Sequence, residues 1–407
     1  MSNTNLTVDW IGNEALQLLH EKLSFIGTIN REFDSSFRQG YGNTIRIRIP
    51  SQYTVTDGRV IDVQDGVQQS TGLTVATQKH VAMRYNSQEM AQDLVNFQRL
   101  HLEPAMATLA AIVENHCISS ATQQTHSIVG VPGQAITSLR YVGEARGRLN
   151  QNLTPQGRGR ALQLDSMTMA RMVDAFAVYN NPAGDISDQY REGFIQRNGM
   201  ADFYENQKVW NWANNGAASS WANTYTFTEG DTVITVSSGA AAPVAGAIIT
   251  FGHTSSANGL YAVHPETKAA YPHLAQFTII SSSATEYTIS PPIYLTGARK
   301  NVARSTGADM PTSSITSVIT IVQGGTGSTY PQPLMYHRDA FTFATAALPL
   351  MDDSIRCVVK TYDGISLRVW EASDIRNDEK LTRIDILYGF AAIRPQLSCR
   401  LIGSSIN

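Results

Sequence analysis

Two stretches near the C-terminus decide the fold: Tyr330-Pro-Gln-Pro-Leu-Met-Tyr-His-Arg-Asp-Ala-Phe-Thr-Phe-Ala-Thr-Ala-Ala-Leu-Pro-Leu350 and Ile375-Arg-Asn-Asp-Glu-Lys-Leu-Thr-Arg-Ile-Asp-Ile-Leu-Tyr-Gly-Phe-Ala-Ala-Ile-Arg-Pro-Gln-Leu397. Between them, residues 365–370 alternate apolar and polar or aromatic side chains, which is the period of two typical of a strand. A charged loop at 374–380 follows, and then an apolar strand from Ile384 to Ile393. The pattern predicts a hairpin-rich sheet.

A second β pattern lies at residues 41–85. Ile45, Ile47 and Ile49 alternate with polar neighbours, Pro50 ends the strand, and two Asp-Gly turn signals follow before an apolar return from Thr71 to Tyr85. A projecting two-stranded ribbon is marginal alone in water, so this one needs a partner. The alternative is an ordinary sheet edge within one domain.

Helical periodicity appears at five places: 8–25, 87–100, 104–121, 138–150 and 167–178. The third has one apolar stripe, formed by Leu102, Met106, Leu109, Val113 and Cys117. Such a stripe indicates core packing. His116 beside Cys117 is not a catalytic pair, because adjacent helical residues point about 100° apart.

Small-residue linkers at 213–220 and 323–328 bracket a separate unit. Six short β-patterned runs lie between them without an intervening helix: 225–228, 232–236, 247–251, 276–280, 287–289 and 317–322. This spacing predicts an inserted small β-barrel or sandwich.

Composition sets further bounds. A chain of 407 residues predicts two or three domains, and its net charge of −3 argues against a dedicated nucleic-acid reader. Charged residues make up only 16%, below the roughly 25% of typical domains, which indicates surface buried against neighbours. No apolar run is long enough to span a membrane. The three cysteines are too scattered for a disulfide framework.

Enzyme signatures are missing from the sequence. There is no G-x-S-x-G elbow, Walker A loop or H-E-x-x-H helix, and the nine histidines show no metal-ligand spacing. We therefore expect no enzyme activity, no cofactor and no metal.

The order HRDAFTFATA…LP, LRVW…DI.ND, TRIDILYGF and RP.L.CRL resembles the C-terminal part of tailed-bacteriophage major capsid proteins. It is most similar to the P-twenty-two-like coat family, and the segments 260–268 and 274–278 share the resemblance. The resemblance implies an α+β chain with the HK-ninety-seven (Johnson) fold, an extended β-ribbon loop, a long spine helix and an inserted β domain.

The resemblance also implies a division of the chain. Expected are an N-terminal arm (1–40), the extended ribbon (41–85), a peripheral domain with the spine helix (86–160), an axial domain in two parts (161–212 and 329–380) around the inserted β domain (213–328), and a C-terminal strand (381–407) that returns to the peripheral domain.

Three groups of residues are candidates for contact with partners. Ribbon residues expected between subunits are Ile45, Arg46, Ile47, Arg48, Ile49, Asp57, Arg59 and Asp62. Arm residues expected at a neighbour or a scaffolding protein are Asp9, Trp10, Glu14 and Glu21. The densest basic group, a candidate for lumenal DNA contact or for inter-subunit ion pairs, is Arg140, Arg146, Arg148, Arg158 and Arg160.

The function implied is that of a structural major capsid protein. It would assemble in the bacterial cytoplasm as pentamers and hexamers, with a scaffolding protein, a portal at one vertex and an optional decoration protein, into the icosahedral virion shell around double-stranded DNA. Two alternatives stay open: a nanocompartment shell protein of the same fold, and a polysaccharide-active enzyme carrying a β-module.

Overall fold

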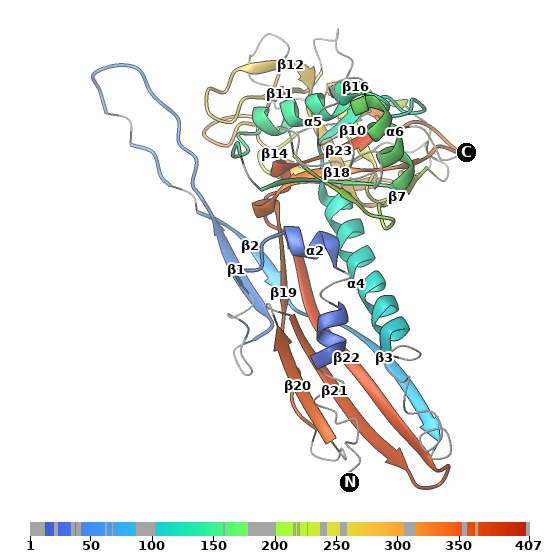
Figure 1. The fold of residues 1–407 in the computed structure, drawn as a ribbon. Helices are drawn as coiled ribbons and strands as arrows, with labels where there is room; N and C mark the ends of the chain where they lie inside the picture. The colour runs from blue at the N-terminus through green and yellow to red at the C-terminus, as the bar shows by residue number, and fades with distance from the viewer. Residues whose placement is uncertain are drawn as a thin grey trace. The chain divides into compact units, whose positions relative to one another are not determined.

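A computed structural model describes residues 13–19, 23–33, 37, 42–61, 63–66, 68–86, 102–157, 159–177, 201–214, 217, 220–225, 227–236, 242–252, 259–304, 315–351, 356–362 and 365–403. The expected helix at 87–100 lies outside these residues. The chain is α+β and forms two compact units (Figure 1). Unit 1 comprises 1–47, 70–117 and 341–393, and unit 2 comprises 48–69, 118–340 and 394–407.

Unit 1 is organised around one long strand, β22 (Glu379–Ala392). It pairs antiparallel with β3 (Thr77–Asn86), with β19 (Phe341–Thr345) and with β21 (Ile365–Asp374), and β21 continues the sheet to β20 (Arg356–Tyr362). These orange-red strands run beside the blue β3 in Figure 1. The hairpin-rich sheet predicted from the C-terminal sequence is confirmed.

Most predicted helices are confirmed, with small shifts at their ends. The long helix α4 spans Glu103–Gln124, α5 spans Leu139–Gln151 and α6 spans Ser166–Ala177. The predicted stripe of α4 is buried, because apolar side chains three and four residues apart share one helix face. The predicted helix at 8–25 is seen as a helix at residues 13–19 and a short α2 (Ser24–Thr28).

Unit 2 contains a five-stranded sheet in the order β4-β23-β18-β5-β6. Its strands are β4 (Ile128–Gly130), β23 (Ser398–Ile402), β18 (Leu334–His337), β5 (Arg160–Leu164) and β6 (Asp202–Glu205). Short 3-10 helices η4 (Arg338–Ala340) and η5 (Pro395–Leu397) flank β18 and β23. Helices α5 and α6 contribute Val142, Leu149 and Met172 to the apolar core beside this sheet.

The inserted module, residues 211–331, also belongs to unit 2. Strands β7 (Asn211–Ala213) and β17 (Thr329–Pro331) pair at its entrance. Six strands then form one antiparallel sheet in the order β8-β16-β10-β13-β14-β9: β8 (Ser220–Tyr225), β16 (Ile315–Ile321), β10 (Ile248–Phe251), β13 (Gln276–Ser282), β14 (Glu286–Ile293) and β9 (Asp231–Thr235). A three-stranded sheet joins β12 (Ala270–Leu274), β11 (Tyr261–Val263) and β15 (Val302–Ala303).

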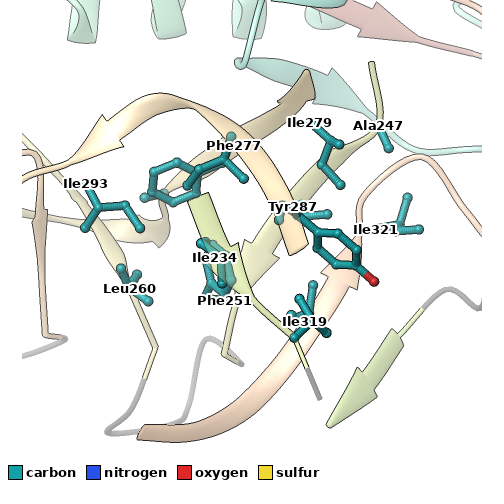
Figure 2. Packing of buried hydrophobic residues seen from close by; sticks show 14 of the residues in the cluster. Ile234, Ala247, Phe251, Leu260, Phe277, Ile279, Tyr287, Ile293, Ile319 and Ile321 are labelled. Carbon is teal, nitrogen blue, oxygen red and sulfur yellow. The ribbon is translucent and has the colours of Figure 1, made fainter. Parts of the chain in front are cut away.

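The module has an apolar core of its own. Phe251 lies edge-on to Phe227 and Phe277, with ring centroids 5.6 and 5.5 Å apart. Figure 2 shows Phe251 and Phe277 among aliphatic side chains that come from the neighbouring strands. Trp212, from the entrance strand β7, belongs to the same cluster. The predicted β module is therefore confirmed as a packed unit of short strands.

Two segments pair differently from the expected division. Residues 77–85, placed in the ribbon by sequence, belong to β3 and pair with β22, so the ribbon pairing is between β1 (Thr44–Ile49) and β2 (Gln69–Thr74). Residues 356–374, placed in the axial domain, form β20 and β21 in the sheet of unit 1. Alternating side chains define a strand but do not identify its partner.

Candidate assembly surfaces

The ribbon has the predicted alternation. In β1 the three isoleucines are half-buried while Thr44, Arg46 and Arg48 are exposed. Ile47 packs against a cluster that includes Leu73 and Val75, which lie on the returning segment. Because Ile47 contributes to this cluster of its own unit, Ile47→Asp would impair folding as well as any contact with a neighbour.

The segment between β1 and β2 exposes apolar side chains. Tyr53, Val55, Val60, Ile61 and Val63 are 63–95% exposed. The two legs of this segment are joined by two hydrogen bonds. The Thr54 amide donates to Gln64 Oε1 at 2.9 Å, and Gln64 Nε2 donates to the Thr54 carbonyl at 2.7 Å. A cluster of exposed apolar residues on a braced loop has the character of a contact surface.

The charged ribbon residues that the structure describes are exposed to solvent. Arg46, Arg48, Asp57 and Arg59 are exposed, whereas Asp62 lies outside the described residues. The role of these residues between subunits remains a prediction.

The described part of the N-terminal arm packs within unit 1. Glu114 of α4 is fully buried, and its Oε1 accepts from Ser24 Oγ at 2.7 Å and from the Phe25 amide at 3.0 Å, at the start of α2. Asn30 continues the attachment, because its amide donates to the Phe341 carbonyl at 3.2 Å and its carbonyl accepts from the Phe343 amide at 3.0 Å. The arm is therefore anchored to its own unit over residues 24–30.

Of the arm residues proposed for external contacts, only Glu14 can be placed. It is half-buried in the helix at 13–19, while Asp9, Trp10 and Glu21 lie outside the described residues. Their contact with a neighbour or a scaffolding protein remains a prediction.

The basic group of 140–160 does not form one uniform exposed patch. Arg140 is exposed and bonds Glu144 at 2.7 Å, and Arg146 is half-buried. Arg160 is buried, and its guanidinium donates to the Asn150 side chain at 2.8 Å and to the Thr154 and Pro155 carbonyls at 2.8 and 3.0 Å. These hydrogen bonds hold the loop at residues 150–155. Arg158 lies outside the described residues.

Arg148 lines a cavity of about 520 Å³ between α5, β4 and the inserted module. His273 and Gln276 of the module face the same cavity. Burial, followed by the positive charge of Arg148, lowers the pKa of His273 to about 4, so this imidazole is neutral at pH 7. Burial also lowers the pKa of Arg148 from its ordinary value. DNA contact by these arginines remains a prediction.

No constellation in the described ranges suggests covalent or metal chemistry. They hold no group of three or more His, Cys, Asp or Glu side chains that could bind a metal ion. Burial, and next the nearby Glu114, raises the pKa of the Cys117 thiol, which keeps it protonated and unreactive. Among the helices described, none is long and apolar enough to cross a membrane.

Comparison with known families gives a match over most of the chain. The family model described as "P22 coat protein - gene protein 5" matches residues 42–403. The chain belongs to the P22 coat protein family. The expected α+β class is confirmed, and the chain contains the long helix, the ribbon pairing and the β module that the resemblance implied.

Solved structures similar to this coat protein are distant in sequence. A chain of Mycobacterium phage Che8 is 11% identical, with 93% of this chain and 90% of that chain covered at a TM-score of 0.49. The mature capsid of bacteriophage PhiM1 is 10% identical, covering 91% and 84% at a TM-score of 0.43. A virus-like particle from Pyrococcus furiosus is 6% identical, covering 97% and 98% at 0.41. A comparison with curated proteins found no match.

Proposed function

We propose that this coat protein is the repeating subunit of a tailed-phage head, assembling as pentamers and hexamers into a closed icosahedral shell around double-stranded DNA. Membership of the coat protein family supports a structural role in the virion. Assembly would use a scaffolding protein and leave one vertex to a portal, in the cytoplasm of the host. No catalytic step is part of this role.

The observation that carries the proposal is the exposed apolar ribbon between β1 and β2. Val55 is 95% exposed and Ile61 is 86% exposed, so an isolated subunit leaves these side chains in water. Covering one such side chain contributes about 1.5–3 kcal/mol. A shell repeats this gain at every subunit contact, so individually weak contacts add up to a stable particle.

Substitution of Val55 tests the proposal. Val55→Asp should leave the circular dichroism spectrum and melting temperature unchanged, because the side chain touches water in the free subunit. With its scaffolding protein the variant should fail to form shells seen by electron microscopy, because an interface would bury an unpaired carboxylate. Val55→Ile keeps an apolar side chain and should assemble. Normal shells from Val55→Asp would contradict the role of the ribbon, and failure of the unsubstituted protein to form shells with its scaffolding protein would contradict the proposed function.

A further inference from the structure

One arginine lies where the C-terminal strand, the long helix and the inserted module meet. Arg400 sits in the middle of β23, where its Cα is paired with Leu334 of β18 and with Ile128 of β4. Its backbone amide donates to the Ser127 carbonyl at 2.8 Å. The side chain is fully buried although it carries a guanidinium, which is costly to bury without polar partners. Among the described residues, Nη1 and Nη2 have hydrogen-bond partners and Nε has none.

The guanidinium bonds three segments from different parts of unit 2. Nη1 donates to the Gly246 carbonyl at 2.7 Å, in the turn that precedes β10 of the module. Nη2 donates to the Gln123 carbonyl at 2.9 Å, in the last turn of α4, and to Thr278 Oγ1 of β13 at 3.1 Å. The guanidinium carbon also lies 5.8 Å from the centre of the Trp210 ring, which suits a cation–π contact.

The charge of Arg400 is balanced by dipoles. Within the described ranges, no carboxylate lies at ion-pair distance from this guanidinium. The C-terminal end of a helix carries a partial negative charge on its free carbonyls, and Gln123 supplies one of them. Burial lowers the pKa of Arg400 to about 9, which leaves the group charged at neutral pH.

The module side of the contact is shaped to receive the guanidinium. Gly246 has a φ of +83°, and a Cβ added there would lie 2.5 Å from the Trp210 ring, so only glycine fits between the ring and the turn. Thr278 Oγ1 also donates to the Gln123 carbonyl at 2.7 Å. The turn, β13 and the helix end therefore share one set of hydrogen bonds.

A second contact holds the module at the neighbouring strand. The Ile128 amide of β4 donates to Gln276 Oε1 at 2.8 Å, and Gln276 Nε2 donates to the Ile128 carbonyl at 3.1 Å. Because Ile128 and Arg400 are paired across β4 and β23, the two contacts lie side by side. Two adjacent anchors restrict rotation about either one.

We propose that Arg400 is a positioning residue, which fixes the orientation of the inserted module on its own subunit through the end of α4. The module is then carried as a rigid part of the subunit, and its linkers are not its only attachment. A planar fork with several donors can join two carbonyls and a hydroxyl from three segments in a fixed geometry. The flexible stem of a lysine does not fix that geometry, and an apolar side chain has no donor.

Amide hydrogen exchange of the full chain tests the proposal with Arg400→Met. The Ile128 amide reports the joint, because its acceptor belongs to the module, and the Ile279 amide, bonded to the Ala247 carbonyl, reports the module interior. Exchange at Ile128 should become at least about tenfold faster, the effect of losing a hydrogen bond to a charged group. Exchange at Ile279 should stay unchanged.

Arg160→Met is the matched control, since Arg160 is also buried but its guanidinium bonds residues 150–155 among the described residues. Arg160→Met should leave the hydrogen-exchange rate of the Ile128 amide unchanged. If Arg400→Met does not fold, Thr278→Val removes the hydroxyl that accepts from Arg400 and donates to Gln123, with little change of shape. It should accelerate amide exchange at Ile128 and leave exchange at Ile279 unchanged. Unchanged exchange at Ile128, or equal acceleration at Ile128 and Ile279, would overturn the positioning role.

Discussion

Arg368 and Asp385 form a buried ion pair on adjacent strands of the unit 1 sheet. Arg368 Nη2 and Nε donate to Asp385 Oδ2 at 2.7 and 3.2 Å, and neither side chain is more than 4% exposed. Arg383 Nε donates to the other carboxylate oxygen at 2.7 Å. The carboxylate thus holds two guanidinium groups within the sheet.

Asp385→Asn should destabilise unit 1 strongly. Removing the carboxylate leaves Arg368 buried without its counter-charge, which costs about 3–5 kcal/mol. Urea unfolding followed by circular dichroism measures the change. The control is Glu379→Gln, which breaks the more exposed pair with Arg84 (3.4 Å) and should cost no more than about 1 kcal/mol. Similar losses in the free energy of unfolding in the two variants would contradict the strong contribution of the buried ion pair between Arg368 and Asp385.

The titration of His273 should depend on Arg148. Because burial is the larger cause of its lowered pKa, Arg148→Gln should raise that pKa above its value of about 4 without restoring 6.5. NMR titration of the His273 imidazole measures its pKa in the variant and in the unsubstituted protein. Arg140→Gln, on the same helix but exposed and bonded to Glu144, should have no effect. An identical His273 titration in Arg148→Gln and wild type would refute the coupling.

The same histidine predicts a loss of stability in acid. With a folded pKa of about 4 and an ordinary value of 6.5, the unfolded chain binds more protons between these pH values. The free energy of unfolding should therefore fall as pH drops from 6.5 toward 4. His273→Gln should flatten this slope in urea titrations at several pH values. A slope that the substitution leaves unaltered would assign the acid sensitivity to other groups.

Substitution by alanine should change the stability in opposite directions at two glycines, Gly389 and Gly147. A methyl group at Gly389 of β22 would overlap the Thr74 carbonyl, so Gly389→Ala should cost about 1–3 kcal/mol. Gly147, inside α5, has nothing within 4 Å of an added Cβ, and Gly147→Ala should stabilise by about 0.5–1 kcal/mol. Thermal unfolding of both variants checks the signs. A stabilised Gly389→Ala would show that the chain near Thr74 does not cross β22 so closely.

The inserted module should fold as an isolated fragment when its entrance strands are included. Trp212 and Ala217 are buried in its core, although they precede the first strand of the six-stranded sheet. A fragment of 209–332 should melt cooperatively. The shorter fragment 221–322 lacks Trp212 and Ala217 and should melt at least about 10 °C lower. Equal melting temperatures, or no cooperative transition in the longer fragment, would contradict this.

Much of the fold is local enough to be predicted. The apolar stripe of α4 and the alternation of Ile45, Ile47 and Ile49 follow directly from helical and strand periodicity. Five of the six runs predicted in the module occur as strands, whereas the run 225–228 overlaps β8 (Ser220–Tyr225) only at its first residue. The three-stranded sheet was missed. Strands β11 and β15 have three and two residues, and β12 contains Pro272, so no periodic signal marks them.

The burial of polar side chains in the interior, and the partners that they bond there, could not be predicted from the sequence. Arg368 alternates with apolar residues and reads as a solvent-facing side chain, yet it is buried because Asp385 lies opposite it in register. Arg400 and Glu114 are likewise buried by partners more than 80 residues away in the sequence. One sequence gives no indication of such distant pairs. Clustering of basic residues along the chain likewise does not establish their exposure, since Arg160 is buried. Contact of the basic group with DNA stays a prediction.

The paired hydrogen bonds between Thr54 and Gln64 bear on how fast and how faithfully subunits join. A loop whose two legs are already hydrogen-bonded in the free subunit loses less conformational entropy on binding. The entropic cost of each subunit contact is therefore smaller. The loop between β1 and β2 can therefore bind a neighbour with a small free energy of association. An incorrect neighbour then dissociates quickly, and the correct one is still recognised.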